Sequence, residues 1–182
     1  MAESMLENIP DGGDIFLIQG PLTDNNVSLI REGIDETLAG SNLNVVYEAN
    51  CPGWIAENAY TYTKEGLKLD RNVKGIICGN DDLASQAFRA LSEERLAGKV
   101  CVTGQDGDLA ACQRIVEETQ EMTAFKSVEQ EASLAAKCAV LLGLGEEIEE
   151  VQDTAYDGTY NVPYLELQPI AVTKENHGRG YH

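Results

Sequence analysis

The sequence predicts an α/β fold of three layers, in which a parallel sheet is flanked by helices on both faces. Two observations carry that prediction. Short apolar runs of strand length alternate with amphipathic helical stretches over the first 126 residues, which is the pattern of βαβ units. Polar residues also follow four of the apolar runs. In a parallel sheet such strand ends share one edge, and ligands bind in the crevice there.

The first half of the chain alternates regularly between helix and strand. The expected order is a helix that ends at Ile9, a strand over 14–19, a helix over 26–39, a strand over 43–47 and a helix over 55–69. Pro10 and the glycines after it stop the first helix. The second helix has apolar residues at helical spacing and is closed by Gly40. A loop that carries Trp54 precedes the third helix.

The second half continues the alternation up to residue 125. The expected order is a strand over 75–78, a helix over 82–95, a strand over 100–103, a helix over 108–119 and a strand over 122–125. Asp82 lies near the N-terminus of the first of these helices, and Asp108 is the expected N-cap of the second.

The helix predicted over 128–144 differs from the others. Ser127 is its expected cap, with Gln130 at a capping-box position. Its apolar residues spread around most of the circumference, whereas a helix that covers one face of a sheet keeps a broad polar side. We therefore expect something beyond one α/β layer to pack on it. A central helix of an ordinary domain is the alternative.

The C-terminal part is expected to be mostly extended. An acidic connection precedes the stretch 160–172, whose two prolines allow only an interrupted or edge strand. The expected division of the chain is an α/β lobe at 1–126, a helix and acidic connection at 127–157, a strand segment that crosses between structural units at 158–176 and a flexible tail at 177–182.

Composition excludes several classes of function. At 182 residues, with 43% hydrophobic and 24% charged residues, the chain has the size and composition of one soluble globular domain. A net charge of −18 disfavours nucleic-acid binding and favours a neutral or cationic ligand. No apolar run could span a membrane, and the N-terminus lacks the features of a signal peptide, so a mature fragment or a cytosolic protein is expected.

No metal, cofactor or catalytic residue is expected. The five cysteines are scattered without CxxC spacing, and the segment 104–108 lacks most ligands of a calcium loop. Asp81 and Asp82, with Asp106 and Lys126, could imitate the phosphorylation site of a receiver domain. The amides and the Trp54 loop at the same strand ends do not fit that role, and no histidine lies near them as a general base.

The polar residues at the strand ends favour a sugar ligand. They comprise amides, carboxylates and one ammonium group, with an indole nearby. Amides and carboxylates pair with hydroxyl groups, and the indole offers a flat apolar face. These features together suit a neutral polyhydroxylated molecule.

These same stretches carry a family resemblance. The chain contains GPLTDNNVSLIREG, CPGWIAENAY, CGNDDLASQAFRAL, GKVCVTGQDGDLAACQRI and MTAFKS. In these runs it resembles the D-xylose-binding proteins of sugar ABC transporters, in the type I periplasmic-binding-protein superfamily, over about residues 1–176. The resemblance implies one Rossmann-like lobe of a solute-binding protein and no enzymatic activity.

The resemblance implies five sugar-binding residues. Asn26 and Asn80 would each pair with vicinal hydroxyls through the donor and acceptor of the amide, and Asp106 would accept from two hydroxyls. Lys126 would donate to a hydroxyl or to the ring oxygen, and Trp54 would stack on the apolar face of the pyranose. Taken singly, each residue could instead be a strand-end cap, a turn residue or a packing residue.

The resemblance also implies an incomplete clamp. These proteins close two lobes over the sugar, and this chain begins where the second lobe begins. The helix over 128–144 would then pack on the first lobe. We expect weak sugar binding, and a homodimer or a complementary N-terminal lobe that covers Leu134, Ala135, Leu141 and Leu142.

Three functions remain open on these grounds. The first is the binding of a D-xylose-like monosaccharide for uptake, by a protein that lies outside the cytoplasm. An ABC permease or a sensor kinase would be its further partner. The second is a sensory or protein-interaction module in which the sugar contacts are vestigial. The third, the effector core of a LacI-type repressor, shares the fold, but the sequence has no helix-turn-helix segment or basic patch.

Overall fold

The computed structural model describes residues 1–149, 151 and 153–176. The expected flexible tail at 177–182 lies outside these residues. The chain divides into two compact units, of which the first comprises residues 1–125 and the segment from Ala171, and the second comprises Lys126–Ile170. Each unit is described by itself below. Among the described residues, no helix combines the length and apolar character needed to cross a bilayer.

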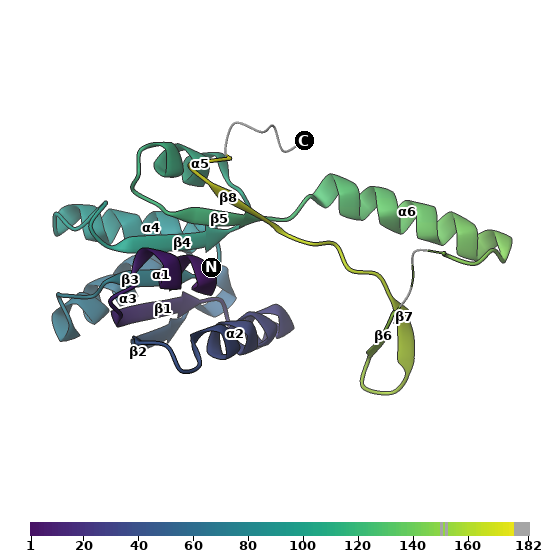
Figure 1. The fold of residues 1–182 in the computed structure, drawn as a ribbon, viewed down its shortest axis with the longest axis horizontal. Helices are drawn as coiled ribbons and strands as arrows, with labels where there is room; N and C mark the ends of the chain where they lie inside the picture. The colour runs from purple at the N-terminus through teal and green to yellow at the C-terminus, as the bar shows by residue number, and fades with distance from the viewer. Residues whose placement is uncertain (150, 152, 177–182) are drawn as a thin grey trace. The chain divides into compact units, whose positions relative to one another are not determined.

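A six-stranded sheet forms the centre of the first unit. Its strands lie in the order β2-β1-β3-β4-β5-β8 (Figure 1). Their bounds are β1 Gly13–Gln19, β2 Leu43–Asn50, β3 Gly75–Cys78, β4 Cys101–Gln105, β5 Met122–Phe125 and β8 Ile170–Thr173. Every neighbouring pair from β2 to β5 is parallel. The carboxyl ends of these five strands therefore lie along one edge, as the alternating pattern predicts.

Helices cover both faces of the sheet, as expected. The helices of this unit are α1 Ala2–Asn8, α2 Asn25–Leu38, α3 Glu57–Leu69, α4 Asp81–Glu93 and α5 Leu109–Val116, with a short 3₁₀ turn η1 at Pro52–Trp54. Because side chains alternate along a strand, β1 contributes to two cores. Phe16 and Ile18 pack in the cluster that includes α3 and α4, whereas Ile15 and Leu17 pack in the cluster that includes α1 and α2. All four are fully buried.

The register of β1 and β2 contains one irregularity. Ile15 pairs with Val45 and Phe16 pairs with Tyr47, so Val46 has no partner on β1. The Val46 side chain is 46% exposed. This is a β-bulge in the edge strand, where one extra residue bends the strand and increases its twist.

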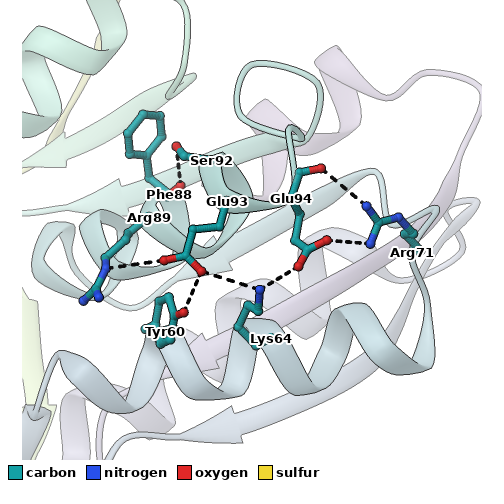
Figure 2. A network of polar contacts seen from close by, with 8 residues as sticks. All are labelled: Tyr60, Lys64, Arg71, Phe88, Arg89, Ser92, Glu93 and Glu94. Carbon is teal, nitrogen blue, oxygen red and sulfur yellow. Dashed lines mark hydrogen bonds and ion pairs between the residues drawn. The ribbon is translucent and has the colours of Figure 1, made fainter.

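A network of charged and phenolic side chains links α3 to α4 on the surface (Figure 2). Lys64 donates to Glu94 at 2.6 Å, and Arg71 donates to the other oxygen of the same carboxylate at 2.7 Å. Tyr60 donates to Glu93 at 2.7 Å. The bonds from Lys64 and then Arg71 lower the pKa of Glu94 to about 2. Solvent screens such groups, so the network contributes modestly to stability at neutral pH.

The second unit contains one helix and one hairpin. Helix α6 spans Val128–Leu144, as predicted, and Ser127 caps it by accepting from the Gln130 backbone N–H at 3.2 Å. No residue of α6 is buried. Strands β6, Asp153–Tyr156, and β7, Asn161–Tyr164, pair antiparallel. The interruption expected in the stretch 160–172 is present as the break between β7 and β8, but the pairing of β7 with β6 was not expected.

Some predicted helix ends are wrong by a few residues. Helix α4 begins one residue early, at Asp81, and its N-cap is Asn80. Helix α5 ends at Val116, and Asp108 stands at the N-cap position without a side-chain hydrogen bond to the helix. Asp108 is thus the N-cap residue, as expected, but its side chain does not form the capping hydrogen bond.

Candidate functional site

The sheet has a topological switch point beside its central strand. Strand β1 has β2 on one side and β3 on the other, so the connections that leave the carboxyl ends of β1 and β3 run to opposite sides. A crevice at such a point is the usual ligand site of an open α/β sheet. The N-termini of α2, α4 and α5 follow the ends of β1, β3 and β4 in the chain and lie at this edge.

Trp54 lies over the switch point. Its indole covers Gly20, which follows β1, so closely that a Cβ at this glycine would lie 2.2 Å from the ring. A Cβ at Gly79, which follows β3, would lie 3.2 Å from the ring. Because Gly20 and Gly79 have no side chain, the indole can lie directly against the backbone at both positions. Trp54 is half-buried and also packs on the core cluster of α3 and α4, so it serves as packing and still presents part of its ring.

Asp24 fixes both Trp54 and the start of α2. One of its carboxylate oxygens accepts from Trp54 Nε1 at 3.0 Å, and the other accepts from the Asn26 backbone N–H at 2.9 Å. Asp24 is thereby the N-cap of α2. The side chain of Asn26 is exposed. Sequence reasoning assigned no role to Asp24, although an aspartate two residues before a predicted helical residue is a capping signal.

The side chain of Asn80 forms a hydrogen bond within the protein in addition to its expected role in sugar binding. Its Oδ1 accepts from the Leu83 backbone N–H at 2.9 Å and caps α4. This bond uses one lone pair of Oδ1 and leaves the second one available, so the expected pairing of both amide atoms with vicinal hydroxyls stays a prediction. The Nδ2 group of this half-buried side chain would supply the donor of such a pair.

Asp106 lies at the end of β4 with an unusual backbone. Its φ is 107°, and the following Gly107 also has a positive φ. The Asp106 N–H donates to the Ala124 carbonyl at 2.9 Å, and the side chain is exposed. Burial, followed by the charges of Asp82 and Asp106, raises the pKa of Asp108.

Asp81 is fully buried, and its carboxylate accepts hydrogen bonds from four donors. Asp81 is therefore unavailable as a member of the acidic pair that the receiver-domain alternative requires beside its phosphorylated aspartate.

The described part of the chain contains no group of three or more histidine, cysteine, aspartate or glutamate side chains that could hold a metal ion. Burial raises the pKa of Cys51 to about 11 and raises that of Cys78 as well, so these thiols are unreactive.

The remaining predicted residues belong to the second unit. Lys126 is its first residue and has an exposed side chain, and its position relative to the four residues of the first unit is not defined. On α6, Leu134 and Leu141 are half-buried, whereas Ala135 and Leu142 are exposed. The structure thus brings Asn26, Trp54, Asn80 and Asp106 to one sheet edge.

Comparison with known proteins identifies similar chains. Residues 1–147 match the family described as periplasmic binding protein domain. The chain is 39% identical over 180 residues to a D-xylose-binding periplasmic protein of Haemophilus influenzae and 36% identical over 180 residues to that of Escherichia coli. Each match covers 96% of this chain and 54% of the relative. The chain therefore spans about half the length of these curated relatives, which are named for binding and not for catalysis.

A solved structure supports the fold. An ABC transporter periplasmic solute binding protein from Actinobacillus succinogenes, crystallised with D-allose, superimposes with a TM-score of 0.83 at 24% identity. The match covers 98% of this chain and 59% of that one.

Proposed function

The chain belongs to the periplasmic binding protein domain family, and from that premise we propose that it forms one wall of a monosaccharide site in a solute-binding protein of a sugar ABC transporter. The proposed ligand is D-xylose or a similar sugar, because two relatives that match along 96% of the chain are D-xylose-binding periplasmic proteins. The proposed location is outside the cytoplasm, as in those relatives.

The observation that carries the proposal is the position of Trp54. Two glycines and Asp24 hold the indole over the switch point of the sheet, where α/β folds bind ligands. A half-buried indole that is fixed by the protein offers an apolar surface to the C–H face of a pyranose. Stacking of this kind requires no charge on the ligand, which suits a chain with a net charge of −18.

The proposed polar contacts divide between donors and acceptors. Asn80 donates through Nδ2 and accepts through the second lone pair of Oδ1, whose first lone pair caps α4. Asp106 accepts from two hydroxyls, and Asn26 pairs with a further one. Lys126 is proposed to donate to a hydroxyl or to the ring oxygen. Such a set selects a neutral ligand with several adjacent hydroxyl groups.

The wall formed by this chain should bind weakly by itself. Sites for small ligands enclose most of the ligand surface, and one wall supplies only part of the contacts and leaves water at the ligand. We expect a dissociation constant on the order of 1 mM or weaker, equivalent to about −4 kcal/mol. A second wall, from the part of the relatives outside the matched 54% or from a second chain, would close the site.

Titration of the isotopically labelled chain with D-xylose, followed by NMR, tests the proposal. D-Xylose should shift the Trp54 indole N–H signal and the Asn80 and Asp106 amide signals in fast exchange, and L-xylose at equal concentration should shift them less. Trp54→Ala and Asp106→Ala should weaken the response. Unchanged signals at these residues would contradict the sugar site, and micromolar binding by a monomer would contradict the single-wall interpretation.

We further propose that α6 is covered by a second copy of the chain or by a complementary lobe, through Leu134, Ala135, Leu141 and Leu142. Val128, Val140 and Leu144 of the same helix are also more than 60% exposed, and exposed apolar surface of this extent marks an interaction site. Sedimentation of Leu142→Glu compared with Leu22→Glu tests self-association, because both leucines are largely exposed but Leu22 lies in the first unit. A monomer at every concentration would contradict the homodimer.

The same surface favours a second function, a sensory or interaction module whose partner is a sensor kinase or a permease. The double variant Trp54→Ala with Asp106→Ala distinguishes the two. In the module, association and signalling persist without the sugar contacts. In an uptake protein, transport depends on them.

A further inference from the structure

Asp81 occupies an unusual position for a charged residue. It is the first residue of α4 and is fully buried. One carboxylate oxygen accepts from the backbone N–H groups of Gly107 and Asp108, both at 3.0 Å, and from the Thr123 hydroxyl at 2.6 Å. The other accepts from Gln120 Nε2 at 3.0 Å. A buried carboxylate with this many donors is well compensated.

A chain of hydrogen bonds from Arg114 through Gln120 to Asp81 fixes which of these side chains donates and which accepts. Arg114 Nε donates to Gln120 Oε1 at 2.9 Å, and Gln120 Nε2 donates to Asp81 and to the Met122 carbonyl. Arg114 is itself only 8% exposed. Because arginine can only donate, the Gln120 amide cannot turn over, and Asp81 must present an acceptor to it.

The donors on the other side belong to the loop that carries Asp106. The φ of Asp106, 107°, lies in a region that non-glycine residues rarely occupy, and such a conformation persists only where the surroundings impose it. Bonds on both sides impose it here. The Asp106 N–H donates to Ala124, and the next two N–H groups donate to Asp81.

The carboxylate of Asp81 fits against strand β4 because residue 104 of this strand is a glycine. A Cβ at Gly104 would lie 2.1 Å from Asp81 Oδ1 and 3.0 Å from Gln120 Nε2. The side chain of Asp81 therefore passes directly against the backbone of the strand that ends one residue before Asp106.

We infer that Asp81 is a positioning residue, which fixes the backbone at 106–108 and so sets the direction of the Asp106 carboxylate in the sugar site. The inference rests on the proposed function for the role of Asp106. Because Asp81 is fully buried, it would act on a bound sugar through the loop and not by direct contact. A carboxylate is required because an amide has only one acceptor oxygen. When that oxygen faces Gln120 Nε2, whose direction Arg114 fixes, the NH₂ group of the amide faces the backbone N–H groups of Gly107 and Asp108 and their bonds are lost.

Asp81→Asn tests the inference, with Asp82→Asn as the matched control. Asp82 is the exposed neighbour in the same helical turn. The control therefore removes a carboxylate charge that also lies near Asp108, but it leaves in place the hydrogen bonds that Asp81 accepts from Gly107 and Asp108. In the ligand-free chain, amide hydrogen exchange at Gly107 and Asp108 should become at least about tenfold faster in Asp81→Asn and stay within about twofold in the control. Unchanged exchange in Asp81→Asn would overturn the inference, whatever the sugar titrations show.

D-Xylose titration separates positioning from general destabilisation. Asp81→Asn should weaken binding about as much as Asp106→Ala, and the double variant should bind no more weakly than Asp106→Ala alone, because the two changes act through one group. Additive losses would overturn the inference. If Asp106→Ala leaves binding unchanged while exchange at Gly107 responds to Asp81→Asn, the proposed function fails and the loop-fixing role stands.

Thr123→Val is the second variant in case Asp81→Asn does not fold. It keeps the shape of the side chain but removes one donor to Asp81 and the acceptor of a second bond from the Gly107 N–H. Faster exchange at Asp108, whose N–H donates to Asp81 and not to Thr123, is the expected result, with the core amides of β1 still protected. Exchange at Asp108 equal to that of the wild type would overturn the inference.

Discussion

Replacing Gly20 by alanine should displace Trp54 from the switch point of the sheet. Gly20 does not have a positive φ, so alanine can adopt its backbone conformation and the effect is purely steric. The new Cβ would lie 2.2, 2.3 and 2.4 Å from three carbons of the indole. These atoms belong to a rigid ring, so the whole side chain has to move.

The size of the effect follows from these distances. Carbon atoms pack at about 3.5–4.0 Å, so the ring must retreat by roughly 1.5 Å. A movement of that size breaks the 3.0 Å hydrogen bond from Trp54 Nε1 to Asp24. Overpacking costs about 1–3 kcal/mol, and the ring can swing toward solvent to relieve it, so we expect a loss of about 2 kcal/mol in the free energy of unfolding.

Fluorescence measures the displacement directly, because Trp54 is the single tryptophan of the sequence. The emission maximum of Gly20→Ala should shift to longer wavelength as the ring becomes hydrated, and urea unfolding followed by circular dichroism gives the stability. Gly33→Ala is the control, since a Cβ at this helical position meets no atom within 4 Å and should stabilise α2 by up to about 1 kcal/mol. An unshifted spectrum with stability within about 0.5 kcal/mol of the wild type would refute the reasoning.

Three further predictions concern caps, pH and thiols. Asn80→Ala removes the cap of α4 and should lower the free energy of unfolding by about 1 kcal/mol in a urea titration, and wild-type stability would show that the cap is dispensable. Because the pKa of Glu94 falls from 4.5 to about 2 on folding, its stabilising contribution is present above pH 4.5 and is lost as the pH drops toward 2. The urea midpoint should thus fall further between about pH 6 and about pH 3 in the wild type than in Glu94→Gln, and parallel decreases would contradict this. Cys51 and Cys78, buried with raised pKa values, should resist iodoacetamide until urea is added, as mass spectrometry can check, and labelling of either in the native chain would count against their burial.

The central strands were predictable because their signals are local. Gly75–Cys78 and Met122–Phe125 have the predicted bounds, since each is a short run of strand-forming residues with polar or charged residues close to both ends. Helix α6 is equally well bounded by Ser127 and by Gly145, whose φ is 72°. In these places the local sequence agrees with the tertiary structure.

Elements that depend on distant pairing were less predictable. Strand β2 continues to Asn50, beyond the expected end at Tyr47, because it pairs with β1 through Gln19. Strand β6 lies in an acidic stretch that suggested a connection, and its pairing with β7 depends on a partner rather than on its own apolar content.

The same limit applies to the candidate site. The strand-end residues are visible in the sequence because they follow apolar runs, but the hydrogen bonds that hold them are not. Asp81 bonds to partners 26, 27, 39 and 42 residues away, and Trp54 bonds to Asp24, 30 residues earlier. A sequence shows the residues of such a network one at a time, and only the fold shows that they meet.

The bulge at Val46 bears on how copies of this chain could associate. An open edge of a sheet exposes unpaired backbone groups to which another chain could add a strand. On β2 the extra residue interrupts the regular spacing of those groups, and the exposed Asn44 and Glu48 place polar side chains along the same strand. Strand addition at this edge is thereby disfavoured. Self-association of the kind proposed for α6 would then proceed through contacts between side chains and not through backbone pairing at this edge.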